Sequence, residues 1–216
     1  PMIQLCNITD NTAWGGGGLF VTDGDPYIIF CKCINNEAAG HGGGFYLNNH
    51  VNAIIDLCDI SNNSASWGGG MTCMVQSDPQ ILNCLFNENI TYNVGGGIFI
   101  RSSSSPDVFS CEFNNNIQIS NPLGSGGGAC IYGGSNGGEP CYPTFTFCSF
   151  ENNAVQGDGG GMAAAYDAHP KLTECYFGSN HAGRSGGGLA CVADSDHLFS
   201  STAEVDGCAF ESNTAD

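Results

Sequence analysis

The chain has 216 residues, and its 21 acidic against four basic residues give a formal net charge of −17 at pH 7. Because binding to phosphate backbones needs clustered lysine and arginine, this balance excludes a nucleic-acid partner. No stretch is long and apolar enough to span a bilayer, so direct membrane insertion is also excluded. The 13 cysteines favour an oxidising, extracellular compartment.

One short pattern recurs along the whole chain, and each copy is anchored on a cysteine. Consecutive anchors are separated by 25 to 37 residues. The eight anchors are Cys6, Cys31, Cys58, Cys84, Cys111, Cys148, Cys175 and Cys208. A repeat of this length is typical of a solenoid, in which no copy buries its apolar face alone and each copy stacks on the next.

Within each copy, the spacing predicts short strands joined by bends. Cys31 and Cys33 share one face of a strand because side chains alternate along it. Ile28 is out of phase with them, so a bend must intervene if all three point inward. Glycine runs such as 42–44 mark a tight corner. The sequence therefore predicts an all-β parallel β-helix of about eight coils, with two or three strands per coil, as a single domain over residues 1–216.

Asparagine stands five residues after every anchor. Its amide can bond turn backbone and the same amide in the neighbouring coil. We therefore expect an internal structural ladder of asparagines at a turn. The members are Asn11, Asn36, Asn63, Asn89, Asn116, Asn153, Asn180 and Asn213.

The cysteines allow two interpretations. Most anchors are expected to be reduced and buried, where a thiol packs as a small hydrophobe. Disulfides are expected instead within a smaller set: Cys31, Cys33, Cys73, Cys130, Cys141 and Cys191. The pair Cys130 and Cys141 is the first candidate because it brackets a long insertion.

Three sequons are present, at Asn7, Asn62 and Asn89. Asn89 belongs to the predicted ladder and is expected to be inaccessible. Asn7 lies next to an inward cysteine and should face outward. Asn7 and Asn62 are therefore the glycosylation candidates.

The pattern C-x-F-x-x-N followed by Gly-Gly-Gly resembles the repeat of polymorphic outer-membrane proteins. The phenylalanine is present at Phe86, Phe113, Phe150, Phe177 and Phe210. Ile8, Cys33 and Ile60 replace it in the first three copies, and the glycine element departs from the family's GGA followed by an aliphatic residue. The resemblance implies a right-handed parallel β-helix of the pectin-lyase-like kind. It also implies a role of the kind that such repeats have in surface adhesins, autotransported passenger domains and other extracellular stalks.

An enzymatic role would require paired carboxylates, or a base with a basic partner, on neighbouring coils. Asp25 and Asp78 do share a register, but they precede proline and are interpreted as turn residues. The four basic residues occupy different registers. We therefore predict no enzyme and no catalytic, cofactor-binding or metal residues. Two aspartate pairs, Asp23 with Asp25 and Asp194 with Asp196, have two interpretations. Each pair either binds calcium in a loop or simply belongs to a solvated turn.

Neither terminal copy carries a polar capping segment of the kind that solenoids need. We therefore expect a segment of a longer repeat protein, or a rod that stacks head to tail on itself. The predicted function is an extracellular structural or adhesive β-solenoid, a building block of a cell-surface fibre, stalk or filament. Glycans or other surface proteins are expected as further partners, and the longer loops 117–125, 132–141 and 195–203 as lateral contact sites. The alternative is a carbohydrate-active β-helix, a polysaccharide lyase or hydrolase, or a glycan-binding module.

Overall fold

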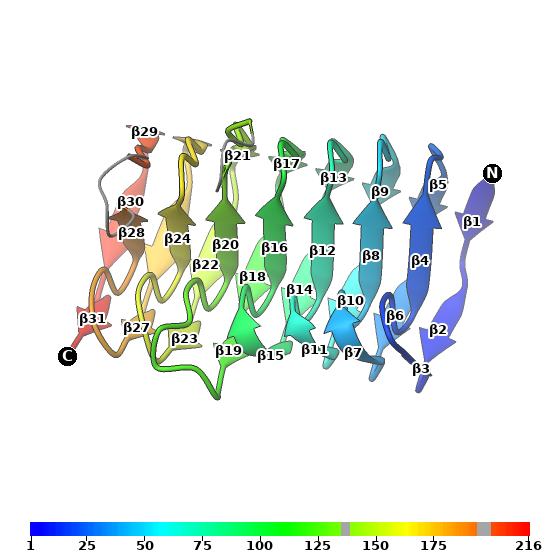
Figure 1. Ribbon diagram of the computed structural model, residues 1–216, viewed down its shortest axis with the longest axis horizontal. Coiled ribbons are helices and arrows are strands. Elements are labelled where there is room, and N and C mark those ends of the chain that lie inside the picture. The colour runs from blue at the N-terminus through cyan, green and yellow to red at the C-terminus, as the bar shows by residue number, and fades with distance from the viewer. Residues whose placement is uncertain (135–138, 194–199) are drawn as a thin grey trace.

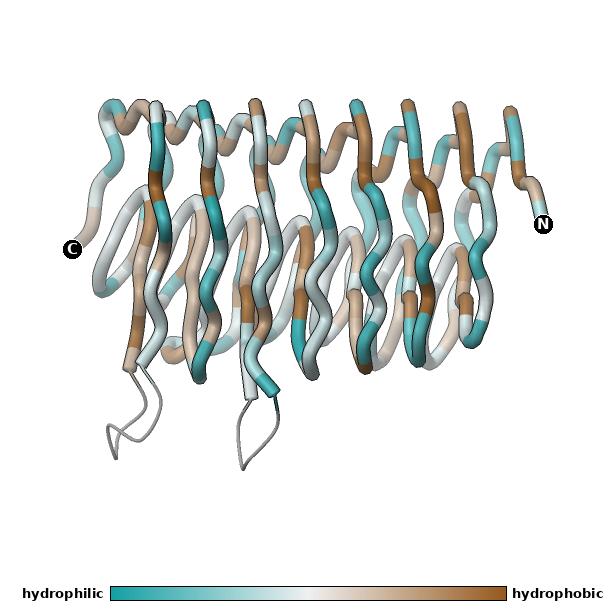
Figure 2. Tube along the Cα trace, turned by 90° about the horizontal axis from the view of Figure 1, so that it is seen from above, coloured by the Kyte–Doolittle hydropathy of each residue, from teal (hydrophilic) through white to brown (hydrophobic). Residues whose placement is uncertain are grey.

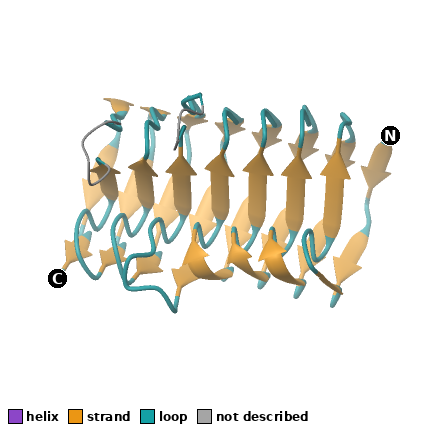
Figure 3. Ribbon diagram, viewed as in Figure 1, coloured by secondary structure: helices purple, strands orange, loops and turns teal. Residues whose placement is uncertain are grey.

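The computed structural model describes residues 1–134, 139–193 and 200–216, and these residues form strands and no helix (Figure 3). Four parallel sheets run along a rod, with the chain ends at opposite ends of it (Figure 1). Three sheets have eight strands and the fourth has seven. The predicted all-β parallel solenoid is confirmed. A complete coil has four strands, however, so the expectation of two or three was wrong.

Sheets A and B contain the strands that flank each anchor cysteine. Sheet A consists of β1 (Met2–Gln4), β5 (Tyr27–Ile29), β9 (Ile54–Asp56), β13 (Gln80–Leu82), β17 (Asp107–Phe109), β21 (Thr144–Thr146), β25 (Lys171–Thr173) and β29 (Glu204–Asp206). Sheet B consists of β2 (Asn7–Thr9), β6 (Lys32–Ile34), β10 (Asp59–Ser61), β14 (Leu85–Asn87), β18 (Glu112–Asn114), β22 (Ser149–Glu151), β26 (Tyr176–Gly178) and β30 (Ala209–Glu211).

Sheets C and D lie on either side of the glycine runs. Sheet C consists of β3 (Thr12–Ala13), β7 (Glu37–His41), β11 (Ser64–Trp67), β15 (Ile90–Val94), β19 (Ile117–Gln118), β23 (Ala154–Val155), β27 (His181–Ala182) and β31 (Thr214–Ala215). Sheet D consists of β4 (Leu19–Thr22), β8 (Phe45–Asn48), β12 (Met71–Met74), β16 (Ile98–Arg101), β20 (Ala129–Tyr132), β24 (Met162–Ala165) and β28 (Leu189–Val192).

The bends on both sides of sheet B each contain one residue in the left-handed region. The residue before every anchor cysteine has a positive φ, for example 54° at Phe30 and 52° at Leu57. The residue before every ladder asparagine does the same, with 59° at Asn35. A single residue in the left-handed region changes which alternate residues of the next strand face the interior. This is why side chains that are out of phase in the sequence all point into the rod.

The glycine runs are required by close approach between coils as well as by the turn. The first glycine of a run lies in the left-handed region, with a φ of 68° at Gly95. A Cβ added at Gly97, the last of the same run, would lie 2.6 Å from the Gly128 carbonyl oxygen in the next coil. No side chain fits at that distance. The glycine corner thus lets neighbouring coils approach to the spacing that the strands impose.

The interior of the rod is one continuous apolar cluster that follows its length. Hydrophobic positions recur from coil to coil along the chain (Figure 2). Ile28, Ile55 and Ile81 fill the column from sheet A and are fully buried. Five phenylalanines fill the column from sheet B, with ring centroids 4.7 Å apart and rings within 8° of parallel. That distance equals the usual separation of hydrogen-bonded strands. Identical side chains therefore stack at the coil repeat.

A continuous hydrogen-bond ladder of asparagine side chains joins all eight coils. The Asn63 amide shows the repeating unit: its Nδ2 donates to Asn89 Oδ1 at 3.1 Å and to the Cys33 carbonyl at 2.8 Å. Its Oδ1 accepts from the backbone N–H and the Nδ2 of Asn36, at 2.9 and 3.0 Å. The same bonds link every consecutive pair from Asn11 to Asn213. Each internal amide is thus fully bonded inside the rod.

We predict that Asn89→Ala destabilises the rod strongly. The substitution removes the acceptor of the buried Asn63 N–H and the donor to the Ile60 carbonyl. Each of these two buried polar groups costs about 1–3 kcal/mol when left unpaired, so the expected loss is about 2–6 kcal/mol. Urea-induced unfolding followed by circular dichroism measures it.

The matched control is Asn87→Ala two residues away, whose side chain bonds only the exposed Asn115 amide. We expect it to cost less than about 1 kcal/mol. Equal losses for the two variants would contradict a special role for the ladder.

Candidate functional site

The anchor cysteines form a second column of hydrogen bonds, with no disulfide among the described residues. Every anchor thiol donates to the carbonyl two residues before it, at 3.1–3.5 Å, as Cys84 does to Leu82. The buried thiols from Cys31 to Cys175 also donate to the coil before, as Cys84 does to Ile55. The thiols therefore supply hydrogen-bond donors to backbone carbonyl groups close to the left-handed corners.

The proposed disulfide between Cys130 and Cys141 is wrong: both thiols are free and buried. Cys130 points outward from sheet D into a small cluster with Val94 and Phe99. Cys141 points into the interior and donates to the Tyr132 carbonyl at 3.4 Å. The two sulfurs therefore lie in separate apolar clusters, Cys130 outside sheet D and Cys141 in the interior.

The candidate glycan acceptors are accessible. Asn7 on β2 and Asn62 at a left-handed corner are both exposed, whereas Asn89 is fully buried in the ladder. Glycosylation of Asn7 and Asn62 stays a prediction.

Asp25 and Asp78, which share a register, lie in a turn column at the junction of sheets D and A. The Asn52 N–H donates to Asp25 Oδ1 at 3.0 Å, and the Tyr142 N–H donates to Ser105 Oγ at 2.9 Å. Asp78 accepts the Ser105 N–H in the same way. These side chains therefore cap the backbone of neighbouring coils, as their interpretation as turn residues predicts.

No group of three or more potential metal ligands occurs among the residues that the structure describes. Asp23 accepts hydrogen bonds from Asn49 and Thr22. Asp194 and Asp196 lie outside the described residues. No helix in the described part of the chain has the length and apolar character needed to cross a membrane.

At the C-terminal end, the same column carries a polar cluster that sequence reasoning missed. His169 pairs through Nδ1 with Thr202 Oγ1 at 2.8 Å and through Nε2 with Asp167 Oδ1 at 2.9 Å. The His169 ring stacks on Tyr142, with centroids 5.3 Å apart. Tyr142, His169 and Thr202 line an open hollow of about 530 Å³. A hydroxyl, an imidazole and a carboxylate in series resemble the arrangement that activates a nucleophile.

An aromatic column lies outside the interior, where sheets C and D meet. The His41 ring stacks between Tyr46 and Trp67, with centroids 5.3 and 4.9 Å away. Burial, and secondarily the nearby Arg101, lower the pKa of His41, so its neutral form is favoured. Trp67 packs on the outer apolar cluster, whereas Trp14 is 69% exposed. Trp67 therefore covers the bend before the glycine run 68–70.

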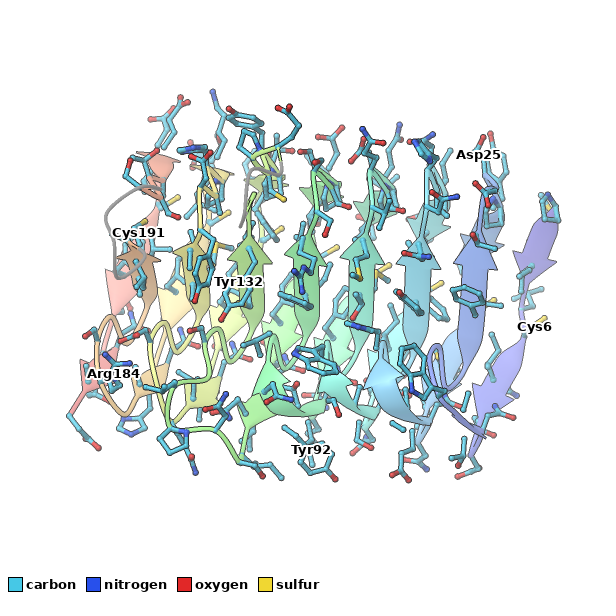
Figure 4. The ribbon with its side chains drawn as sticks, in the orientation of Figure 1. Cys6, Asp25, Tyr92, Tyr132, Arg184 and Cys191 are labelled. Atoms are coloured by element: carbon cyan, nitrogen blue, oxygen red, sulfur yellow. The ribbon has the colours of Figure 1, made fainter. Side chains whose placement is uncertain are left out.

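A cleft on the outer face of sheet D was also not foreseen. Two hollows of about 330 and 430 Å³ share Asp158, Arg184 and Val192 in their linings, so they adjoin each other. Figure 4 labels Tyr132, Arg184 and Cys191, which lie in the walls of this cleft over the C-terminal part of the rod. The available sequence signal was the string of alanines 163–165, where other coils carry larger side chains.

A family model described as the right-handed β-helix region matches residues 2–137, more than half of the chain. The chain therefore belongs to the right-handed β-helix family, and the handedness implied by the repeat is confirmed. No curated protein and no solved structure matches the chain.

We predict that few thiols react in the native rod. Only Cys6, Cys191 and the half-buried Cys208 are open to solvent. Burial raises the pKa of the Cys141 thiol to about 11, which further suppresses its reactive thiolate. Iodoacetamide at pH 7.5 should label no more than these three sites, as mapped by peptide mass spectrometry.

The control is the same labelling in guanidinium without reductant, which should modify all 13 cysteines. A smaller total in the denatured chain would reveal disulfides and contradict the free-thiol arrangement.

Proposed function

We propose that this chain is a structural and adhesive β-solenoid of an extracellular fibre, stalk or filament that assembles end to end. The observation that carries the proposal is the unbroken asparagine ladder. It gives every coil interface the same set of bonds, from Asn11 to Asn213. Such a rod is stabilised by nearest-neighbour contacts and gains length by adding coils.

The extracellular location draws its support from the surface. The exposed sequons at Asn7 and Asn62 suit a secreted, glycosylated chain. A net charge of −17 keeps rods apart laterally through repulsion. The cysteine content supports this location less than composition alone indicated, because the anchor thiols serve as hydrogen-bond donors.

End-to-end assembly is supported by the repetition of the coil interface. Strand pairs along all four sheets are parallel and in register over most of their length. The same pairing would join the last coil of one copy to the first coil of another. Unpaired strand groups at a sheet edge favour such addition.

We predict that the chain forms linear assemblies and that Phe210→Glu abolishes them. Phe210 ends the phenylalanine stack and is 45% exposed. A carboxylate there would be buried unpaired in an end-to-end contact, which is costly. Analytical ultracentrifugation over a concentration series and electron microscopy measure the assembly.

The matched control is Phe109→Glu, because Phe109 is 43% exposed but lies on the side of the rod. It should assemble like the unmodified chain. A chain that stays monomeric at every concentration, or equal assembly of the two variants, would contradict end-to-end growth.

The alternative, a carbohydrate-active β-helix, is favoured by the cluster of His169, Thr202 and Asp167. If the cluster supports a lyase or hydrolase, His169→Ala should lower the release of new chain ends from polysaccharide by at least about 100-fold. Reducing-end and unsaturated-sugar assays measure this release.

The control is His181→Ala. His181 contacts Thr214 at 3.0 Å and Asp216 at 3.8 Å, but it is exposed and lies away from the hollow. Equal effects of the two variants, or no release by the unmodified chain, would eliminate catalysis at His169.

A further inference from the structure

The outward-facing side chains of sheet D become smaller toward the C-terminal coils. One outward column runs from Arg101 through Tyr132 to Ala165 and Val192 in successive strands. The loss of side-chain volume after Tyr132 leaves a depression over the strands that follow it. Ala165 lines it, and its small side chain therefore determines how deep it is.

The depression contains a charge pair built from scarce residues. Asp158 has a side chain only 9% exposed, and its Oδ2 lies 3.4 Å from Arg184 Nη1. Arg184 is one of four basic residues in the chain, and its side chain is 51% exposed. The carboxylate is therefore held beneath the surface, while the guanidinium remains free to turn toward a ligand. Together they offer an acceptor and several donors within one small region.

Aromatic rings form the wall next to this pair. The rings of Tyr132 and Tyr166 meet edge to face, with centroids 4.9 Å apart. Both tyrosines line the same hollow as Asp158 and Ala165. Burial raises the pKa of Tyr132, so its hydroxyl remains protonated. The cleft thus combines an apolar floor, aromatic walls and polar groups at one end, which is the usual composition of a small-ligand site.

We propose that this cleft binds a neutral saccharide unit. Adjacent hydroxyls can donate to Asp158 and accept from Arg184, while the C–H face of a sugar ring packs against tyrosine. The net charge of −17 and the buried carboxylate disfavour an anionic sugar. Arg184 disfavours a cationic ligand. This inference rests on the proposed adhesive role and gives it a ligand and a location.

Saturation-transfer NMR with the methyl glycosides of glucose, galactose, mannose and N-acetylglucosamine tests the inference. At least one should receive saturation from the chain, whereas methyl galacturonate should receive none. Ala165→Leu fills the cleft and should abolish the transfer. Tyr166→Asn should reduce it at least fivefold, and asparagine tolerates the φ of 55° at this position.

The control variant is Tyr92→Ala, which removes an exposed tyrosine on β15 that lines neither hollow and should leave the transfer unchanged. Circular dichroism establishes that each variant retains the rod. The inference is overturned if no neutral glycoside is saturated, if the galacturonate binds equally, or if Ala165→Leu and Tyr166→Asn bind normally. Assembly is measured separately by ultracentrifugation. A failure of sugar binding can therefore be distinguished from a failure of the proposed end-to-end assembly.

Discussion

The rod depends on one repeated interaction, the amide-to-amide bond between asparagines of adjacent coils. Each internal asparagine accepts a backbone N–H and donates to a backbone carbonyl, both in the preceding coil. Asn89, for example, accepts from the Asn63 N–H and donates to the Ile60 carbonyl. Without these bonds, the turn between sheets B and C would hold buried polar groups with no partner. The ladder therefore allows a closed turn within an apolar interior, and the columns of sulfur and phenylalanine follow from the register that it fixes.

The interior could be predicted almost completely from the sequence. Spacing placed Ile28, Cys31 and Cys33 on one inner surface and required a bend between the first two. The number of strands was underestimated because a corner can be a single left-handed residue. Phe30 and Leu57 occupy such corners although neither favours this region, so local propensity gave no signal.

The surface could be predicted far less well. Periodicity assigns a residue to the inside or outside, but it does not tell which outward side chains converge. The cleft at Asp158 depends on Arg184 from the following coil and on the small size of Ala165. The pairing of Cys130 with Cys141 failed for the related reason that proximity in sequence says nothing about which face of a strand carries the sulfur. Core and surface thus obey different rules in this chain.

The constant distance from anchor cysteine to ladder asparagine has a consequence for how the chain can change. That distance is five residues in every coil, whereas the anchor spacing varies between 25 and 37 residues. Most variation in length therefore falls in the connections on either side of sheet D, and a one-residue difference lies in sheet C, where the register shifts between Ala65 and Trp67. Additional residues at these two edges leave every column of the interior aligned. The rod can therefore carry connecting loops of different lengths while the geometry of its interior stays constant.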